Sequence, residues 1–238
     1  MSSIAANLEA VRRRIAAALP EAAREVVIVA VSKQRPPEAI RAAAAAGCTD
    51  IGESYAQEAL PKVAALAGAG LRWHFIGHVQ TNKAREIASG FDWVHAVDRV
   101  KVATALDRAR PEGLAPLDVC VQVNISAEAT KGGVAPPAAL ALCREVAALP
   151  RLRLRGLMGM AAPSGDVAIQ RAQFASLRQA FHEVRDAGLD VDTLSMGMSD
   201  DFEAAVAEGA TMVRIGSAIF GARHPLPGPL PRERESRS

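Results

Sequence analysis

Short apolar runs alternate with segments of helical periodicity along most of this chain. Apolar residues gathered in runs of about four to eight are typical of buried strands, whereas apolar residues that recur every three or four positions indicate amphipathic helices. We therefore predict a series of strands, each followed by a helix except the last. The strands are expected at residues 26–32, 50–53, 72–77, 93–97, 118–125, 152–159, 193–197 and 212–216.

The alternation of strand and helix sets the predicted fold class. Strands joined by helical crossovers pair in parallel, and eight such units in 238 residues favour a closed barrel over an open doubly wound sheet. We predict an α/β protein with a single TIM-type (β/α)8 barrel, and an open sheet is the alternative. Residues 4–19 have apolar positions at helical spacing, and we expect this N-terminal helix to cover the gap that the last strand leaves.

A single domain is expected, because no linker long enough to divide the chain interrupts the alternation. We assign residues 1–223 to the barrel. Residues 224–238 contain four prolines and lack a periodic apolar face. The composition of this Pro/Arg-rich tail is typical of a disordered segment.

Composition and charge narrow the range of partners. The formal net charge is only +2, and no cluster of lysine and arginine is interleaved with aromatic residues, so neither a nucleic acid nor an anionic membrane is indicated. No signal peptide and no apolar run of the ~20 residues that span a bilayer is recognisable, so we expect a cytoplasmic protein. The scattered Cys48, Cys120 and Cys143 favour apolar packing in a reducing compartment.

A lysine follows the first predicted strand. Lys33 comes directly after residues 26–32, and a lysine at this place can form a Schiff base with an aldehyde cofactor. Taken alone, a lysine at a strand end is usually a solvated surface residue. In a closed barrel, however, the first and last strands are neighbours, and active sites form at the C-terminal ends of the strands. Lys33 is therefore expected to lie beside the residues that follow the last strand.

The residues after the seventh and eighth strands are suited to a phosphate. Gly216 lets the backbone approach an anion closely, and the amide and hydroxyl of Ser217 can donate to phosphate oxygens. Ser199 can donate in the same way, although a serine before Asp200 and Asp201 also fits a helix N-cap. A lysine for an aldehyde and a site for a phosphate together suggest pyridoxal phosphate as the cofactor.

Arg214 shares a face of the last predicted strand with Gly216. A buried arginine needs a partner, and two are possible. One is a salt bridge to a carboxylate of the barrel. The other is the ring nitrogen of the cofactor, where an arginine donates a hydrogen bond and leaves the pyridine unprotonated. A carboxylate there would make a stronger electron sink, so the arginine favours holding the cofactor over carbanion chemistry.

Several segments resemble the pyridoxal phosphate homeostasis protein family, and the similarity runs from about residue 4 to residue 223. They are VAVSK at 29–33, IGESYAQE at 51–58, WHFIGHVQTNK at 73–83, GLMGM at 156–160, LSMGMSDD at 194–201 and MVRIGSAIFG at 212–221. The resemblance implies a barrel like the N-terminal domain of alanine racemase. It also implies that pyridoxal phosphate is linked to Lys33, with its phosphate on Ser199, Gly216 and Ser217 and its ring nitrogen at Arg214.

Two further features stay outside the predicted site. Ser54 stands where the family usually has the asparagine of a Gly-Glu-Asn-Tyr motif, which puts in doubt any contact that the asparagine makes with the cofactor. His74 and His78 are four residues apart, but on a strand and its following loop this spacing does not place them on a common face. We therefore predict no metal site.

The resemblance implies a protein that holds pyridoxal phosphate as a reversible Schiff base and takes part in its intracellular homeostasis without robust catalysis. We expect it to be a monomer. Pyridoxal-phosphate-dependent acceptor enzymes are the possible partners. The first alternative is an enzyme similar to an amino-acid racemase, which would need an acid or base at the alpha carbon, often tyrosine; Tyr55 is the one tyrosine. The second alternative is a cofactor-free Schiff-base aldolase, in which Arg214 and the phosphate turn bind a sugar phosphate.

Overall fold

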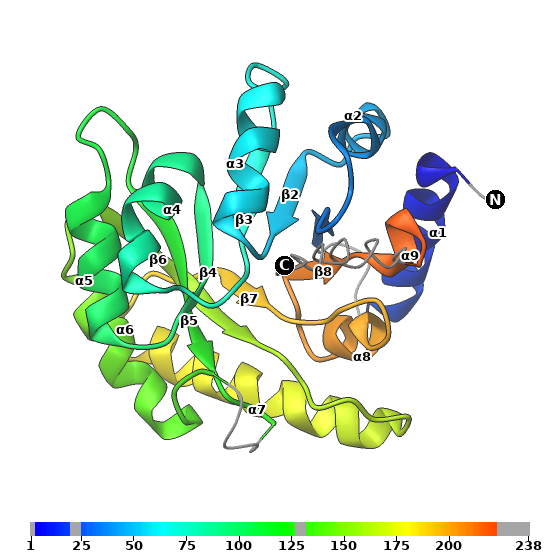
Figure 1. The fold of residues 1–238 in the computed structure, drawn as a ribbon. Helices are drawn as coiled ribbons and strands as arrows, with labels where there is room; N and C mark the ends of the chain where they lie inside the picture. The colour runs from blue at the N-terminus through cyan, green and yellow to red at the C-terminus, as the bar shows by residue number, and fades with distance from the viewer. Residues whose placement is uncertain (1–2, 20–24, 127–131, 223–238) are drawn as a thin grey trace, which may run out of the picture.

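The structure, a computed structural model, describes residues 3–19, 25–126 and 132–222. Within these residues eight strands form a closed parallel barrel in chain order, and β1 pairs with β8 to close it (Figure 1). The strands are β1 (Val27–Val31), β2 (Asp50–Glu53), β3 (Arg72–Phe75), β4 (Trp93–Val97), β5 (Leu117–Val123), β6 (Leu152–Gly159), β7 (Thr193–Ser195) and β8 (Met212–Ile215). The predicted α/β barrel is confirmed, and the open sheet is excluded.

Several strands end one or two residues earlier than their apolar runs predict. β7, for example, ends at Ser195 and not at residue 197. The Met196 amide still donates to the Met212 carbonyl, and the Arg214 amide donates to the Gly197 carbonyl, both at 3.0 Å. Gly197, however, has a φ of 93°, which takes the backbone out of the extended conformation. The last apolar residues of the predicted strands therefore belong to the loops at the C-terminal mouth of the barrel.

Helices connect the strands and form the outer layer (Figure 1). They are α1 (Ile4–Ala18), α2 (Pro37–Ala45), α3 (Ala56–Ala65), α4 (Ala84–Gly90), α5 (Val100–Ala109), α6 (Ala139–Ala147), α7 (Val167–Asp186), α8 (Phe202–Ala207) and α9 (Ser217–Phe220), with 3-10 helices η1 (Thr81–Lys83) and η2 (Pro136–Ala138). No segment of helical period was predicted after the last strand, and α9 is only a short helical turn that begins at Ser217. The four residues of α9 are too few to show a helical period in the sequence.

The opening helix covers the barrel where the chain closes on itself. Figure 1 shows α1 beside α9 and α8, and it also contacts α2. Its inner face buries Leu8, Val11 and Ile15, and burial of such side chains contributes about 1.5–3 kcal/mol each. The Asn7 amide nitrogen donates to the Ile219 carbonyl of α9 at 2.8 Å. The predicted position of this helix is confirmed.

Within the described residues, every helix is too short or too polar to span a bilayer. The three cysteines are free and buried, and they pack in the core as the sequence predicts. Burial raises the pKa of the Cys48 thiol to about 11 and that of the Cys143 thiol to about 12. The predicted tail at 224–238 lies outside the described residues.

Candidate functional site

The predicted site residues come together at the C-terminal ends of β1, β7 and β8. β1 and β8 are paired, with Val29 opposite Arg214. Lys33 follows the end of β1, and Gly216 follows the end of β8. A Cβ built on Gly216 would lie 3.5 Å from the Val31 carbonyl oxygen, so the loop of Lys33 and the glycine turn are in contact. The closed barrel thus joins residues that are 183 positions apart in sequence.

The Lys33 side chain is partly buried at this mouth. Its ammonium lies over the Tyr55 ring, 4.8 Å from the ring centroid. Within the described part of the chain, Lys33 makes no side-chain hydrogen bond and no ion pair. An amine without a carboxylate partner is available for covalent chemistry, because no ion pair has to break before it reacts.

The backbone before Lys33 is fixed by a buried ion pair. The Ser32 hydroxyl donates to Glu53 Oε1 at 2.5 Å, and Lys62 Nζ donates to the Ser32 carbonyl at 2.9 Å. Lys62 also pairs with Glu53 at 2.7 Å. Burial raises the pKa of Glu53, and the hydrogen bonds from Lys62 and Ser32 oppose that rise. Glu53 and Lys62 were not among the residues predicted for the site.

The backbone after Lys33 is held from α3. The Gln34 amide donates to Glu58 Oε1 at 2.5 Å, and Lys62 Nζ donates to the same oxygen at 2.7 Å. Gln34 has a φ of 60°, in the left-handed region that non-glycine residues seldom adopt. The contact with Glu58 compensates for this strained turn. Lys33 is therefore fixed at both of its neighbours while its own side chain is free to react.

Ser199 links the loops after β7 and β8. Its hydroxyl oxygen accepts a hydrogen bond from the Ala218 amide at 3.3 Å. The alternative interpretation as a helix N-cap is wrong, because α8 begins at Phe202 and its N-cap position is Asp201. Asp201 instead accepts from the Met198 amide at 2.6 Å, and Asp200 is exposed. The Ser199 hydroxyl therefore faces the turn that contains Gly216 and Ser217.

The turn at Gly216 is not crowded. The three atoms nearest to a Cβ built on Gly216 all belong to Val31 and lie at ordinary contact distances. Ser217 is exposed and begins α9. The Ser199 and Ser217 hydroxyls and the nearby amides are suitable donors to phosphate oxygens. These residues fit a phosphate group.

Arg214 points into the barrel and is almost fully buried, with 4% of its surface exposed. Its Nη1 donates to Ser195 Oγ at 2.7 Å, and its Nη2 donates to the Gly159 carbonyl at 3.0 Å. No carboxylate of the described residues forms an ion pair with it, so the alternative of a salt bridge is not what the structure contains. Burial lowers the pKa of Arg214 to about 10, while Asp201 opposes the change. It is a cation at neutral pH with further N–H groups for a ligand.

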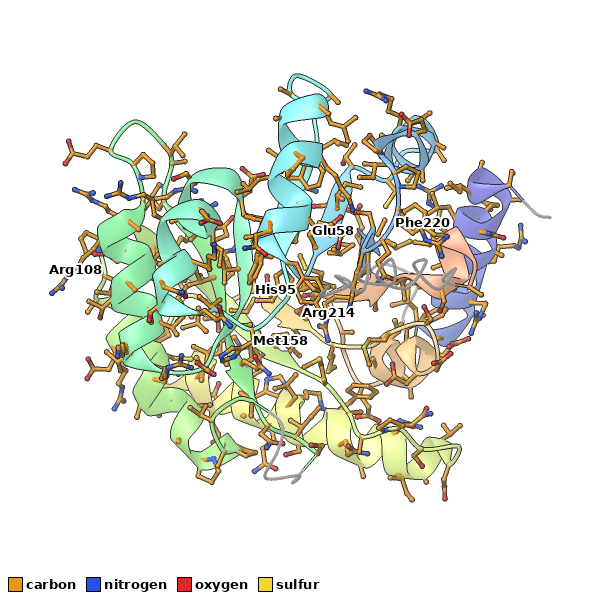
Figure 2. The ribbon with its side chains drawn as sticks, in the orientation of Figure 1. Glu58, His95, Arg108, Met158, Arg214 and Phe220 are labelled. Carbon is orange, nitrogen blue, oxygen red and sulfur yellow. The ribbon has the colours of Figure 1, made fainter. Side chains whose placement is uncertain are left out.

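Polar side chains that the sequence analysis did not assign lie behind Arg214 in the barrel interior. Figure 2 shows His95 and Arg214 near the centre of the barrel. Ser195, His95 and Asp50 all point inward and are buried. In the sequence, each of these three is a polar residue within a predicted buried strand, and this feature could have identified them. His74 joins this group through Asp50 and His95. Among the described residues no three side chains of metal-ligating types are arranged so that they could hold a metal ion.

Ser54 and Tyr55 line an open pocket of about 300 Å3, to which Lys83 and not Lys33 contributes. Gly77, from the WHFIGHVQTNK segment, packs against its backbone. A Cβ on Gly77 would lie 2.0 Å from the Ser54 carbonyl oxygen, so only glycine fits there. Two of the segments that carry the resemblance are therefore adjacent at the mouth of the barrel.

Comparison with known proteins agrees with this geometry. The sequence profile of the family described as alanine racemase, N-terminal domain, matches residues 2–224. The pyridoxal phosphate homeostasis protein of Pseudomonas aeruginosa is 54% identical over 226 residues, which are 94% of this chain and 97% of that protein. The protein of the same name from Escherichia coli is 47% identical over 229 residues, covering 94% and 98% of the two chains.

Solved structures share the fold. The structure of PipY from Synechococcus elongatus with PLP bound has a TM-score of 0.81 and 37% identity, and the match covers 92% of this chain and all of that one. Alanine racemase from Clostridium difficile has a TM-score of 0.70 at 16% identity and shares only the fold, over 57% of its length. The full-length matches and the identities above 40% show that this chain belongs to the pyridoxal phosphate homeostasis protein family, within the alanine racemase N-terminal domain family.

Proposed function

We propose that this protein holds pyridoxal 5'-phosphate as a reversible Schiff base on Lys33 and takes part in pyridoxal phosphate homeostasis without robust catalysis. The observation that carries the proposal is the Lys33 amine, which has no ion-pair partner among the described residues and lies at the mouth of the barrel beside the turn at Gly216. The PLP-bound structure of PipY, a relative at 37% identity, supports the choice of cofactor.

Each site residue has a defined part in holding the cofactor. Lys33 would supply the amine that condenses with the aldehyde of the cofactor, with loss of water, and water or another amine would reverse this condensation. Ser199, Gly216 and Ser217 bind the phosphate through hydroxyls and amides. Arg214 donates to the ring nitrogen. The cofactor supplies an aldehyde that condenses with amines.

The site favours storage over turnover. An arginine at the ring nitrogen does not stabilise a protonated pyridine, which weakens the electron sink that racemisation needs. Tyr55 is the one tyrosine of the chain, and 56% of its surface is exposed. A general acid or base works best where water is excluded and its position is fixed. We propose that the cofactor is kept for pyridoxal-phosphate-dependent acceptor enzymes in the cytoplasm, and that the protein acts as a monomer.

Two measurements on one sample test the proposal. Titration with pyridoxal phosphate should produce the visible absorption band of a lysine Schiff base, and the loaded protein should transfer the cofactor to an apo-enzyme that depends on it. Incubation with L-alanine in D2O should then show no exchange of the alpha proton at rates typical of enzymes, which are about 1 s⁻¹ or faster. Fast exchange would favour the racemase-like enzyme instead. Absence of the band would favour the cofactor-free aldolase.

A further inference from the structure

A continuous chain of hydrogen bonds runs from Arg214 through the interior of the barrel. Arg214 Nη1 lies 2.7 Å from Ser195 Oγ, which lies 2.8 Å from His95 Nδ1. His95 Nε2 lies 3.0 Å from His74 Nδ1, and His74 Nε2 lies 2.9 Å from Asp50 Oδ1. These residues come from β8, β7, β4, β3 and β2. The chain links the cofactor side of the barrel to the interior near its opposite end.

All members of this chain are buried. Ser195, His74 and His95 have no exposed surface, and 6% of Asp50 is exposed. The indole of Trp93 stacks on His74 with ring centroids 5.4 Å apart and an interplanar angle of 17°, which shields the imidazole. Burial lowers the pKa of His74, although its bond to Asp50 opposes this. Burial lowers the pKa of His95, and the positive charge of Arg214, or of His74 if it were protonated, acts in the same direction.

Both ends of the chain dictate where its protons lie. At one end Arg214 can only donate, so the Ser195 oxygen accepts, and its own hydrogen is available to a neutral His95 that accepts at Nδ1. At the other end the ionised Asp50 can only accept, so His74 carries its hydrogen on Nε2 and accepts at Nδ1. His95 then donates from Nε2 to His74. One arrangement of hydrogens satisfies all four bonds, with both imidazoles neutral.

We propose that Ser195, His95, His74 and Asp50 are positioning residues that fix the guanidinium of Arg214 and set the strength of its hydrogen bond to the cofactor ring nitrogen. Every donor in the chain points from Arg214 toward the anionic Asp50. The Ser195 hydroxyl therefore directs a lone pair of its oxygen at Arg214, and its bond to His95 keeps it in that orientation. With Nη1 held by Ser195 and Nη2 by the Gly159 carbonyl, the remaining N–H groups have a fixed direction.

The inference rests on the proposed function, but its first test does not. In the cofactor-free protein, ¹⁵N NMR of the histidine side chains should show both His74 and His95 as neutral rings with hydrogen on Nε2 at pH 7.5. In Ser195→Ala the His95 Nδ1 resonance should move, because its donor is lost. A ring with hydrogen on Nδ1, or a cationic ring, in the folded wild-type protein would overturn the chain while leaving the assignment of Lys33 untouched.

The second test uses the loaded protein. Ser195→Ala should shift the absorption maximum of the bound cofactor and raise its dissociation constant about tenfold, because Arg214 loses a fixed partner. Ser195→Thr keeps the hydroxyl and should restore both values. Thr193→Val is the matched control, because it removes another buried hydroxyl of β7. Among the described residues this hydroxyl bonds only to Asp192, at 2.7 Å, so both values should stay unchanged.

Asp50→Asn extends the test to the far end of the chain and provides a second variant if Ser195→Ala fails to fold. Asparagine keeps the shape of Asp50 but removes its charge. We expect a smaller shift of the absorption maximum in the same direction as in Ser195→Ala. If the folded Ser195→Ala or Asp50→Asn protein has the wild-type spectrum and dissociation constant, these buried residues only fill space and do not position Arg214. If the wild-type protein forms no adduct on Lys33, the proposed function fails. The NMR measurement still shows whether the hydrogen bonds from Arg214 to Asp50 have the proposed directions.

Discussion

The ammonium of Lys33 lies 4.8 Å from the centroid of the Tyr55 ring. Among the described residues, the Lys33 ammonium has no ion pair and no other aromatic ring beside it. The Tyr55 ring therefore lies against the atom that would carry the cofactor. Tyr55 itself is more than half exposed and lies at the N-cap position of α3. The ring is therefore a cover over the reactive amine and contributes little to the core.

Replacing the ring should change the chemistry of the lysine with little effect on the fold. Tyr55→Leu should leave the free energy of unfolding within about 0.5 kcal/mol of wild type, because the side chain is exposed. It should release bound cofactor to hydroxylamine faster, because the ring no longer shields the bond between Lys33 and the cofactor from the reagent. Tyr55→Phe keeps the ring and should match wild type. Equal release rates in all three proteins would show that the ring is no cover.

A methyl group at Gly216 should separate cofactor binding from folding. The Cβ of Gly216→Ala would meet Val31 only at ordinary contact distance, so the thermal midpoint should change little. The same methyl group would occupy space that we assign to the phosphate, and the dissociation constant for pyridoxal phosphate should rise at least about tenfold. Gly113→Ala, which adds a Cβ in open space, is the control. Unchanged affinity in Gly216→Ala would place the phosphate elsewhere.

Loss of the buried lysine under the Lys33 loop should destabilise the protein strongly. Lys62→Met leaves Glu53 buried and unpaired, and we expect a loss of about 3–5 kcal/mol in the free energy of unfolding, measured with urea. Adding Glu53→Gln should recover part of this loss, because it removes the unpaired charge. Lys83→Met breaks a more exposed pair with Glu86 and should cost less than about 1 kcal/mol. Similar losses in Lys62→Met and Lys83→Met would argue against the buried pair.

The buried histidines should make the protein sensitive to mild acid. Burial lowers the pKa of His74 and His95 below the value of about 6.5 that they have when unfolded. The unfolded state then binds more protons, so stability is complete above about pH 6.5 and falls as the pH decreases, by up to about 1.4 kcal/mol per pH unit for each histidine. His95→Gln should reduce this slope between pH 6.5 and 5. An unchanged slope would mean that His95 does not contribute.

The repeating pattern of the sequence was sufficient to predict the barrel, since each strand is a local apolar run and each helix has a local period. The opening helix was equally predictable from Leu8, Val11 and Ile15, which form one apolar face. The four-residue α9 was not, because it spans barely one helical turn and its packing against α1 is a tertiary contact. Strand ends were overestimated where glycine turns such as Gly197 follow an apolar run.

The candidate site was predictable only where chemistry and topology coincide. Lys33 and Gly216 could be predicted to lie close together because a closed barrel makes β1 and β8 neighbours. Ser195 and His95, which are 100 positions apart and 2.8 Å from each other, could not be paired from the sequence. Nothing in their local sequence distinguishes a hydroxyl that orients an arginine from one that fills space; only the three-dimensional arrangement does.

The most direct test of the central claim is borohydride reduction of the protein in the presence of pyridoxal phosphate, followed by peptide mass mapping. We predict one reduced adduct, on Lys33, which is absent in Lys33→Ala although that variant keeps the wild-type thermal midpoint. Lys101→Ala, an exposed lysine of α5, should retain the adduct. An adduct that persists in Lys33→Ala, or none in the wild-type protein, would contradict the assignment of Lys33 and the function built on it.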